Sequence, residues 1–418
     1  MRGPVQAILL AAGKGTRMWP LATRTPKPLL PVAGRSLLWR MLDGLAAAGA
    51  RECIVVVGHG ATAVQGHAKA WRGAMKVRCV DQGEPKGTGH AVAAAARHVR
   101  EDCLLAMADG AVDAATLRAL AKAKGFTVAA AEVEDPTRYG ALKVRGKSVL
   151  GIAEKSSRPP SRLVNTGFYK VPLAAVQECA ALKPSPRGEL EFTDVLAAWA
   201  KRGEVRWAKA KGWLDVGAPW DLLAANATLL PAMLDLLLDG AAAGTGGTGT
   251  IEEGVQVRGR LYVEAGAIVR SGTYVEGDVV VGAGSRVGPN AYLRGPTAIG
   301  AGCHVGAATE VKASVLLAGA NAPHLNYVGD SVLGEGCNLG AGTVVANLRH
   351  DDAPVRVHHR GKVVDTGRRK FGAIVGDGAK TGVNSSLNPG TILGPGVLVP
   401  AGMAVKGTIE SGVAGRTA

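Results

Sequence analysis

Residues 263–305 read VEAGAIVRSGTYVEGDVVVGAGSRVGPNAYLRGPTAIGAGCHV, with an aliphatic residue at every sixth position. A period of six matches neither the 3.6-residue period of a helix nor the two-residue period of a strand. Hexapeptide repeats are typical of a parallel β-helix, in which each repeat forms one short face and turns a corner. The aliphatic side chains are then expected to point inward and stack on counterparts one coil away. The spacing holds over twelve consecutive positions: Ile251, Val257, Val263, Val269, Val275, Val281, Val287, Leu293, Ile299, Val305, Val311 and Leu317.

The six-residue period is interrupted twice. Leu317 and Tyr327 are ten residues apart, so we predict that about four extra residues leave the coil as a loop that carries His324. The second interruption covers residues 346–372. Insertions in a solenoid become loops on one face, often the binding face, so we expect function in these two loops. The pattern continues at Leu333, Leu339, Val345, Val375, Leu387, Leu393, Val399 and Val405.

The chain before residue 240 follows a different pattern, in which short apolar runs alternate with Ala- and Leu-rich stretches. One such stretch, SLLWRMLDGLAAAG (36–49), suits an amphipathic helix. Strands alternating with helices predict an α/β domain with a mostly parallel sheet covered on both faces. The runs that suit buried strands are QAILLAA (6–12), CIVVVGH (53–59), CLLAMAD (103–109) and TVAAAEV (127–133).

The length of the chain, 418 residues, is too great for a single ordinary core. A helical segment is expected at about 219–239. The run AAAGTGGTGT (241–250) is small and uncharged, which predicts a flexible linker. We therefore predict a first domain over residues 1–230, a helix and linker over 231–250, and a β-helix domain over 251–418.

The composition and charge limit the classes of partner. Hydrophobic residues make up 47% and charged residues 20% of the chain, which is typical of a globular protein. The net charge of +15 would suit nucleic acid, but the basic residues are dispersed and aromatic residues are only 4%. Base-stacking platforms need more aromatic side chains, so small phosphorylated ligands explain the charge better. We expect no nucleic-acid partner.

The cysteines and the N-terminal residues indicate the compartment. Six cysteines are scattered without a C-x-x-C pair, which suits reduced, packed thiols. The first residues lack a signal-peptide cleavage pattern, and no apolar run reaches membrane-spanning length. A cytoplasmic protein without a membrane partner is expected.

A glycine-rich turn with clustered cations follows the first predicted strand, in LLAAGKGTRMWPLATRTPKPLLPVAG (9–34). Gly13 and Gly15 allow backbone N–H groups to approach phosphate oxygens, and Arg17 and Lys27 can neutralise them. The spacing matches neither the G-x-x-x-x-G-K-[ST] of a P-loop nor the G-x-G-x-x-G of a dinucleotide site. The turn therefore predicts a phosphate site of another kind.

This motif resembles that of the sugar-1-phosphate nucleotidylyltransferases, whose fold is a Rossmann-like nucleotidyltransferase domain. Further segments match in the family's order: QGEPKGTGHAV (82–92), MADG, RYGALKV, IAEKS, NTGFYKV, GELEFTDVL (188–196) and GWLDVGAPWDLLAAN (212–226). The resemblance implies catalytic roles for Arg17 and Lys27 and Mg²⁺ binding by Asp109 and Asp215. It also implies nucleotide binding by Leu10, Ala11, Gly13, Gly15, Thr16, Gln82, Gly87 and Thr88, and sugar binding by Gly140, Glu154 and Asn165.

The chemistry of nucleotidyl transfer requires these groups. A sugar phosphate oxygen attacks the α-phosphorus of a nucleoside triphosphate, UTP or dTTP, and pyrophosphate leaves. The nucleophile is already ionised near neutral pH, so no general base is needed. Mg²⁺ held by carboxylates and cations beside the leaving group meet the requirement.

The β-helix carries a second resemblance. EVKASVLLAGANAPHLNYVGDSVLGEGCNLGAGTVVANL (310–348) is similar to the acetyltransferase half of the bifunctional glucosamine-1-phosphate acetyltransferase/N-acetylglucosamine-1-phosphate uridylyltransferase family, and ANLRHDDAPVRVHHRGKVVDTGRRKFGAIVGD resembles its archaeal-type branch. The resemblance implies a left-handed parallel β-helix and a homotrimer with acetyl-CoA as co-substrate. It implies that His324 is the general base, that Ala341 lines the acetyl-CoA cleft, and that the hexosamine-1-phosphate is bound by Arg294, Lys312, Tyr327, Asn338 and Asn347.

Acetyl transfer from a thioester to an amine requires a neutral amine. An amino sugar is largely protonated near neutral pH, so its nitrogen must lose a proton at or before attack. Histidine, with a reference pKa of about 6.5, is the side chain best suited to accept that proton. An isolated loop histidine is more often a surface residue without a role, but the broken repeat and the neighbouring Tyr327 favour catalysis by His324.

Three hypotheses about the function of the whole chain follow. The first is a bifunctional enzyme of UDP-N-acetylhexosamine synthesis, which acetylates glucosamine-1-phosphate or galactosamine-1-phosphate and then transfers a uridylyl group to the product. The second is a nucleotidylyltransferase for glucose- or mannose-1-phosphate with a structural β-helix; the intact HLNY stretch argues against it. The third is a non-catalytic regulatory relative, such as an initiation-factor exchange subunit, which would lack the clustered cations and aspartates.

Overall fold

The computed structural model describes residues 5–240 and 243–415, which divide into two compact units. The first consists of Met1–Lys14, Thr25–Leu30 and Ser36–Asp215, and the second of Gly15–Arg24, Pro31–Arg35 and Val216–Ala418. None of the helices formed by the described residues combines the length and apolar character needed to cross a membrane.

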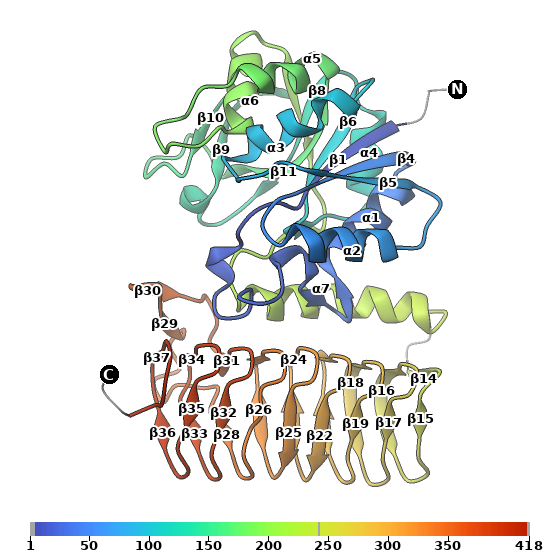
Figure 1. Cartoon of the computed structure of the whole chain (residues 1–418), viewed down its shortest axis with the longest axis vertical. Helices are drawn as coiled ribbons and strands as arrows, with labels where there is room; N and C mark the ends of the chain where they lie inside the picture. The colour runs from blue at the N-terminus through green and yellow to red at the C-terminus, as the bar shows by residue number, and fades with distance from the viewer. Residues whose placement is uncertain (1–4, 241–242, 416–418) are drawn as a thin grey trace. The chain divides into compact units, whose positions relative to one another are not determined.

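A twisted sheet forms the centre of the first unit, in the order β5-β4-β1-β6-β11-β8-β12-β10-β9 (Figure 1). The expected parallel pairing is found among β5, β4, β1 and β6 and between β8 and β12, whereas β11, β9 and β10 pair antiparallel. All four predicted strand runs lie in this sheet. Its strands are β1 (Val5–Leu10), β4 (Ala50–Val57), β5 (Lys76–Asp81), β6 (Cys103–Met107), β8 (Phe126–Glu132), β9 (Gly140–Arg145), β10 (Ser148–Glu154), β11 (Leu163–Val171) and β12 (Val205–Lys209).

Helices cover both faces of this sheet, because successive residues of a strand point to opposite faces. In β1, Ala7 and Leu9 pack into one core with side chains of α1 (Leu37–Ala47), α2 (Ala61–Ala70) and α4 (Ala114–Lys122). Ile8 and Leu10 pack into the other core. The helices on that side are α3 (Thr88–Ala95), α5 (Leu173–Glu178) and α6 (Phe192–Lys201).

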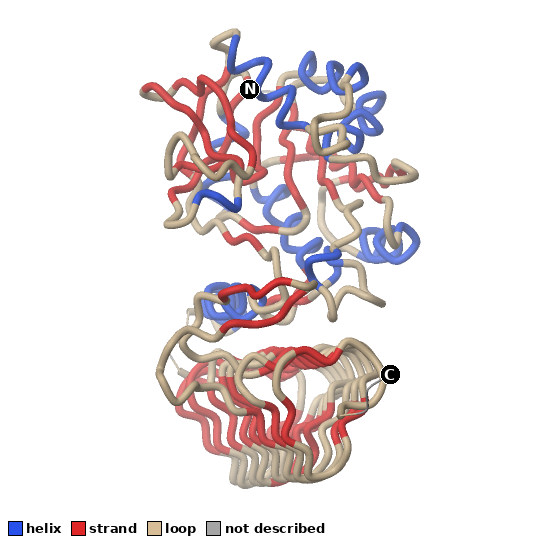
Figure 2. The backbone as a smooth tube through the Cα atoms, turned by 90° about the vertical axis from the view of Figure 1, so that its left-hand side faces the viewer, coloured by secondary structure: helices blue, strands red, loops and turns tan. Residues whose placement is uncertain are grey.

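The second unit contains the predicted parallel β-helix, whose successive coils overlie one another in Figure 2. Partners in the early coils are 18 residues apart, as Val275 with Leu293 and Val287 with Val305. The strands are β14 (Gly244–Gly247), β15 (Thr250–Ile251), β16 (Gln256–Val263), β17 (Ile268–Val269), β18 (Tyr274–Val281), β19 (Arg286–Val287), β20 (Tyr292–Arg294), β21 (Thr297–Ile299), β22 (His304–Ala307), β23 (Glu310–Lys312), β24 (Val315–Leu316), β25 (Asn321–His324), β26 (Tyr327–Gly329), β27 (Val332–Leu333), β28 (Val344–Val345), β31 (Ala373–Val375), β32 (Lys380–Thr381), β33 (Ser386–Leu387), β34 (Thr391–Leu393), β35 (Leu398–Val399), β36 (Ala404–Val405) and β37 (Thr408–Ile409).

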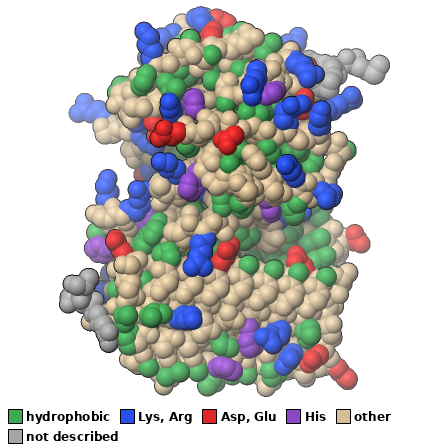
Figure 3. Space-filling view, viewed as in Figure 1, with side chains coloured by type: hydrophobic (Ala, Val, Ile, Leu, Met, Phe, Trp, Pro, Cys, Tyr) green, Lys and Arg blue, Asp and Glu red, His purple; other side chains and the backbone are tan. Residues whose placement is uncertain are grey.

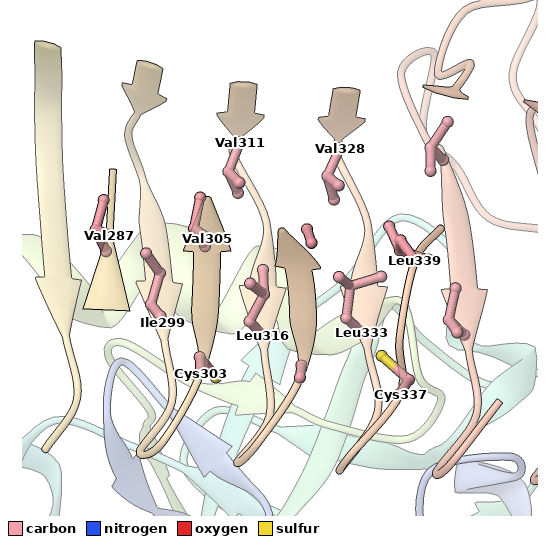
Figure 4. Close-up of a cluster of buried hydrophobic side chains, with 14 of the residues drawn as sticks. Val287, Ile299, Cys303, Val305, Val311, Leu316, Val328, Leu333, Cys337 and Leu339 are labelled. Carbon is pink, nitrogen blue, oxygen red and sulfur yellow. The ribbon is translucent and has the colours of Figure 1, made fainter. Parts of the chain in front are cut away.

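The prediction that about four extra residues leave the coil as a loop around His324 is wrong. Ile299 pairs with Leu316, Val305 with Ala322 and Val311 with Val328, so the chain stays in the coil and the coil is one residue shorter. Leu316 therefore takes the inward position expected for Leu317, and Val328 the one expected for Tyr327. Figure 4 shows the resulting columns of stacked inward side chains. The small side chain at one inward position, Ala322, hides the continuing repeat from a search for large aliphatic residues.

The second predicted insertion is confirmed. Leu333 pairs with Val375 and Val345 with Leu387, so the intervening segment lies outside the coil register. This segment forms an antiparallel hairpin of β29 (Arg356–His359) and β30 (Lys362–Asp365). The hairpin contacts β34 and β37 and projects from the coils (Figure 1).

The prediction of a flexible linker over residues 241–250 is also wrong for residues 243–250. Residues 241 and 242 lie outside the part of the chain that the structure describes. β14 pairs in parallel with β16, so the coils begin within the glycine-rich run. Backbone hydrogen bonds need no large side chain, and glycine permits close approach: a Cβ on Gly247 would lie 2.0 Å from the carbonyl oxygen of Val263. A run that looked unstructured from its composition is the first strand of the solenoid.

Helix α7 (Asp221–Leu237) confirms the helical segment expected at 219–239 and belongs to the second unit. It packs against β16, β18, β21 and β24. Val280 and Val315 alternate with inward-facing residues and so point outward, yet both are buried. An apolar outer column on the coils is thus covered. This explains why the last and longest segment of the second unit starts at Val216, before the predicted end of the first domain at residue 230.

Candidate functional site

The phosphate-binding turn starts at the carboxyl end of β1. Leu10 pairs with Met107 of β6, and the backbone N–H of Ala108 donates to the carbonyl of Leu10 (3.0 Å). In a parallel sheet the carboxyl ends of neighbouring strands form one edge, where ligands bind in α/β folds. A Cβ on Gly13 would have no neighbour within 4 Å, so space is open beside the turn. Leu10 and Ala11 lie buried at its base.

Gln82 follows β5 at the same edge, and its backbone N–H donates to the carbonyl of Val57 (2.9 Å). Its Oε1 atom is buried and has no hydrogen-bond partner among the residues that the structure describes. A buried acceptor without a partner costs about 1–3 kcal/mol, so it is suited to a ligand that brings a donor. The N–H edge of a nucleobase is such a donor.

Gly87 and Thr88 are held by the GELEFTDVL segment. A Cβ on Gly87 would lie 2.4 Å from the carbonyl oxygen of Leu190, and its φ of 122° favours glycine. Thr88, the first residue of α3, accepts a hydrogen bond at Oγ1 from the N–H of Phe192 (3.0 Å). Two segments about a hundred residues apart therefore fix the turn that leads into α3.

Asp109, Lys27 and Asp215 come together beside this edge. Lys27, on the 3-10 turn η2 (Lys27–Leu29), is 6% exposed, and its Nζ lies 2.8 Å from Oδ2 of Asp109. Strands β7 (Gly110–Ala111) and β13 (Leu214–Asp215) pair antiparallel and set Asp215 opposite Gly110. A Cβ on Gly110 would lie 2.8 Å from the carbonyl oxygen of Leu214, so the glycine permits this close pairing.

This donor set suits Mg²⁺. Magnesium prefers hard oxygen ligands and in nucleotide sites is usually held by one or two carboxylates together with substrate phosphates. The pairing of β7 with β13 brings two carboxylates, Asp109 and Asp215, to adjacent positions. Lys27 lies beside them as a cation for a phosphate group.

The predicted sugar residues lie on three paired strands. Glu154, at the end of β10, is opposite Gly140, and a Cβ on Gly140 would lie 2.5 Å from Oε1 of Glu154. Asn165, on β11, donates from Nδ2 to Oη of Tyr169 (2.7 Å). Burial raises the pKa of Glu154, and Arg187, at 3.7 Å, opposes that rise. Sequence reasoning missed Arg187, whose only signal was its position just before the GELEFTDVL match.

A second polar cluster lies on the β-helix around Asp330, a residue that sequence reasoning also missed. Oδ2 of Asp330 lies 2.8 Å from Nζ of Lys312 and accepts from Nδ2 of Asn347 (2.6 Å). Nδ2 of Asn347 is also 3.3 Å from Oη of Tyr327. Burial, Glu310 and Asp330 raise the pKa of Tyr327, so its hydroxyl stays a donor at neutral pH.

Arg294 stands one coil before Lys312 in the same column and forms an ion pair with Glu310 (3.0 Å). The next position of the column is Gly329, where a Cβ would lie 2.6 Å from Nδ2 of Asn347. The glycine leaves room for the Asn347 amide beside Lys312. The structure thus assembles four of the predicted sugar-phosphate residues along one face: Arg294, Lys312, Tyr327 and Asn347.

His324 lies at the corner between β25 and β26, with its side chain exposed. The buried Asn326 accepts from the N–H of His324 (3.1 Å) and donates to the carbonyl of Gly340 (2.8 Å), which fixes the corner. The carbonyl of His324 accepts from the N–H of Gly342 (3.1 Å), so His324 and Ala341 lie on neighbouring coils.

Asn338 lies on another face of the coils. It bridges Asn321 on one side and Lys380 on the other, as part of the column that includes His304. Within the part of the chain that the structure describes, no hydrogen bond or strand pairing joins Asn338 to the Asp330 cluster. Its predicted role in sugar binding is therefore not explained by the geometry of this chain.

Charged side chains are dispersed over the face of the molecule that Figure 3 shows. On the face shown in Figure 3, Lys and Arg side chains are scattered among uncharged groups. This agrees with the dispersed basic residues of the sequence. The two polar clusters described above bring charged residues together within each unit: Lys27 with Asp109, and Lys312 with Asp330.

The chain matches known proteins along nearly its whole length. Residues 6–231 match the family described as nucleotidyl transferase, and residues 275–410 match the one described as GMPPB C-terminal domain. The chain is 38% identical to the bifunctional protein GlmU of Methanococcus maripaludis over 97% of this chain and 96% of the relative. It is 36% identical to that of Methanocaldococcus jannaschii, with the same coverage.

A third relative carries a broader name. The chain is 33% identical to the bifunctional sugar-1-phosphate nucleotidylyltransferase/acetyltransferase of Sulfurisphaera tokodaii, over 98% of this chain and 99% of the relative. The matches cover both units, each of which carries its own polar cluster. The chain is therefore an enzyme of the family of bifunctional sugar-1-phosphate nucleotidylyltransferases/acetyltransferases.

Proposed function

We propose that this enzyme N-acetylates glucosamine-1-phosphate or galactosamine-1-phosphate with acetyl-CoA and then transfers a uridylyl group from UTP to the product. The observation that carries the proposal is the Lys312–Asp330–Asn347 cluster on the coils. A β-helix that served only assembly would have no reason to bury this polar network beside a glycine. The cluster therefore favours the bifunctional reading over a structural solenoid.

In the acetylation, the amine nitrogen attacks the thioester carbonyl carbon of acetyl-CoA. The N–C bond forms, the C–S bond breaks, and coenzyme A leaves as a thiol. His324, exposed at its corner, accepts the proton that the nitrogen loses. Arg294 and Lys312 bind the sugar phosphate, while Asp330 holds Lys312 and Asn347 in place.

In the uridylyl transfer, a phosphate oxygen of the N-acetylated sugar attacks the α-phosphorus of UTP, and the bond to the β-phosphate oxygen breaks. Arg17 and Lys27 neutralise the charge that develops on pyrophosphate. Asp109 and Asp215 would hold Mg²⁺, which would supply further positive charge at the phosphates. Gln82, Gly87 and Thr88 bind the base, and Gly140, Glu154 and Asn165 orient the sugar; Gly15 and Thr16 continue the phosphate-binding turn.

The remaining assignments belong to the same proposal. The β-helix is left-handed, three copies of the chain form a homotrimer, and Ala341 lines the acetyl-CoA cleft. Asn338 contacts substrate in that assembly. The buried cysteines, none of which forms a disulfide, suit the reducing cytoplasm.

Two assays on the purified enzyme test the proposal. Free thiol is measured with acetyl-CoA and each of glucosamine-1-phosphate and galactosamine-1-phosphate, and pyrophosphate is measured with UTP or dTTP and the N-acetylated products. We expect thiol release with at least one hexosamine phosphate and Mg²⁺-dependent pyrophosphate release with its acetylated product. Absence of thiol release with both amino sugars would show that the β-helix is structural.

A further inference from the structure

The phosphate-binding motif continues from the first unit into the second. Residues Gly15–Arg24, which include the 3-10 turn η1 (Thr16–Met18), belong by their contacts to the unit that contains the β-helix. Thr16 and Arg17, which belong to the phosphate-binding motif, therefore lie in a segment that groups with the C-terminal half of the chain. We call Gly15–Arg24 the signature loop.

The hairpin β29–β30 provides the first set of neighbours. Nε2 of His359, at the end of β29, lies 3.1 Å from the carbonyl oxygen of Arg17. The centre of the His359 ring lies 6.1 Å from that of the Trp19 ring and 5.4 Å, edge-on, from that of the Trp220 ring. His359 is only 8% exposed. The ring thus contacts two indoles, and its Nε2 is directed at the backbone carbonyl of Arg17.

The chemistry of this contact defines the state of the ring. A carbonyl oxygen only accepts hydrogen bonds, so Nε2 of His359 carries a proton and donates a hydrogen bond to the carbonyl oxygen of Arg17. Nδ1 is buried and has no hydrogen-bond partner among the described residues. Burial lowers the pKa of His359, although the hydrogen bond to Arg17 opposes this. A neutral ring with the proton on Nε2 satisfies both observations.

Two more contacts hold the signature loop at its ends. Nη1 of Arg360, next to His359, donates to Oγ1 of Thr16 (3.1 Å). At the far end of the loop, Oγ1 of Thr23 donates to Oδ2 of Asp377, in the coil that follows the insertion (3.3 Å). The hairpin and the coils therefore hold both ends of the signature loop.

We propose that His359 is a positioning residue for nucleotidyl transfer: by holding the Arg17 backbone, it orients the Arg17 side chain toward the triphosphate. The inference rests on the proposed role of Arg17 in that reaction. It gives the insertion in the β-helix a function in the reaction of the other half of the enzyme. Holding the loop before substrate binds lowers the entropy that must be lost in the transition state.

Matched variants separate the hydrogen bond from the packing. His359→Phe keeps an aromatic ring beside Trp19 and Trp220 but removes the hydrogen-bond donor, whereas His359→Gln keeps a donor and removes the ring. His358→Ala is the control, because His358 is the adjacent, exposed residue on the opposite face of the hairpin. Steady-state pyrophosphate and thiol release, melting temperature and amide hydrogen exchange of residues 15–24 are measured for each.

We expect His359→Phe to lower kcat/KM for UTP roughly tenfold, mainly through kcat, and to speed exchange in the signature loop. Thiol release and melting temperature should stay near wild type, and His359→Gln should recover most of the loss. Wild-type kcat/KM in His359→Phe, or equal losses in the Phe and Gln variants, would overturn the positioning role. Failure of the wild-type enzyme to release pyrophosphate would instead overturn the proposed function. In that case, faster hydrogen exchange of residues 15–24 in His359→Phe would show that His359 holds the loop but has no role in catalysis, and the positioning role would be overturned as well.

Discussion

Nζ of Lys27 and Oδ2 of Asp109 lie 2.8 Å apart, which joins a buried cation to a carboxylate that is 41% exposed. Residues 82 positions apart in sequence thus form one charged pair at the carboxyl edge of the sheet. The pair places a fixed positive charge where pyrophosphate is expected to leave.

Replacement of Lys27 by methionine should remove this charge and keep most of the side-chain volume. We expect kcat/KM for pyrophosphate release to fall about 10²–10³-fold, because a preorganised cation is lost from the leaving group. Thiol release should not change. Lys69→Met, at an exposed position on α2, is the control, and unaltered pyrophosphate release in Lys27→Met would refute the role.

The close pairing of β7 with β13 gives a second prediction. In Gly110→Ala the new Cβ would meet the carbonyl oxygen of Leu214 at 2.8 Å, so β13 must move and carry Asp215 with it. We expect the apparent Mg²⁺ affinity, measured by titrating pyrophosphate release, to fall about tenfold or more. Gly66→Ala, inside α2 with no atom within 4 Å of the new Cβ, should leave affinity unchanged. Equal Mg²⁺ titrations for Gly110→Ala and wild type would contradict the two-aspartate site.

His324 should be required for only one of the two reactions. His324→Ala is expected to slow thiol release about 10²–10⁴-fold, the usual worth of a general base. Pyrophosphate release and melting temperature should stay unchanged, because the side chain is exposed and Asn326 fixes the corner through backbone atoms. Normal thiol release in His324→Ala would show that a group other than His324 accepts the proton from the amine. Asn326→Ala should impair both melting temperature and acetylation.

Asp377 should make stability depend on pH. Burial raises its pKa from an ordinary 3.8 to about 6. Folding therefore favours the protonated carboxyl. The stability that the fold gains from this preference is fully present below about pH 3.8 and is lost as pH rises through about 6. At pH 8 the buried carboxylate should destabilise the fold by up to about 3 kcal/mol.

Asp377→Asn tests this directly, because the amide has the shape of the protonated carboxyl. We expect the variant to melt higher than wild type at pH 8 and equally at pH 4, as measured by thermal unfolding. Asp365→Asn, in the exposed strand β30, should show no such pH-dependent difference. A constant difference between Asp377→Asn and wild type across this range would exclude titration of Asp377 as the cause.

The repeat made the β-helix predictable, because each coil buries its aliphatic residues against the next in a fixed register. The same search failed where an inward residue was small. Ala322 continues the repeat as well as a valine does, and Val328 follows six residues later. The glycine-rich run before Ile251 was missed for a related reason, since its strand pairs through backbone hydrogen bonds and contains no large apolar side chain.

The motif residues were predictable in type, but their partners were not. Lys27 and Asp109 could be named from local patterns, whereas Asp330 and His359 act through contacts with distant residues. Asp330 meets Lys312 and Asn347 only because the coils stack, and His359 meets Arg17 across more than three hundred residues of chain. Periodicity contains no information on such pairings.

The assignment of Gly15–Arg24 to the β-helix unit changes how the two activities can be dissected. A chain cut after residue 215 or 230 would keep Lys27, Asp109 and Asp215 but lose His359, Arg360 and Asp377. Weak nucleotidyl transfer by such a fragment would reflect a loosened signature loop as well as any loss of assembly. If His359 positions Arg17 as proposed, the second half of the chain takes part in the first reaction, and exchanging one half for that of a relative should weaken nucleotidyl transfer.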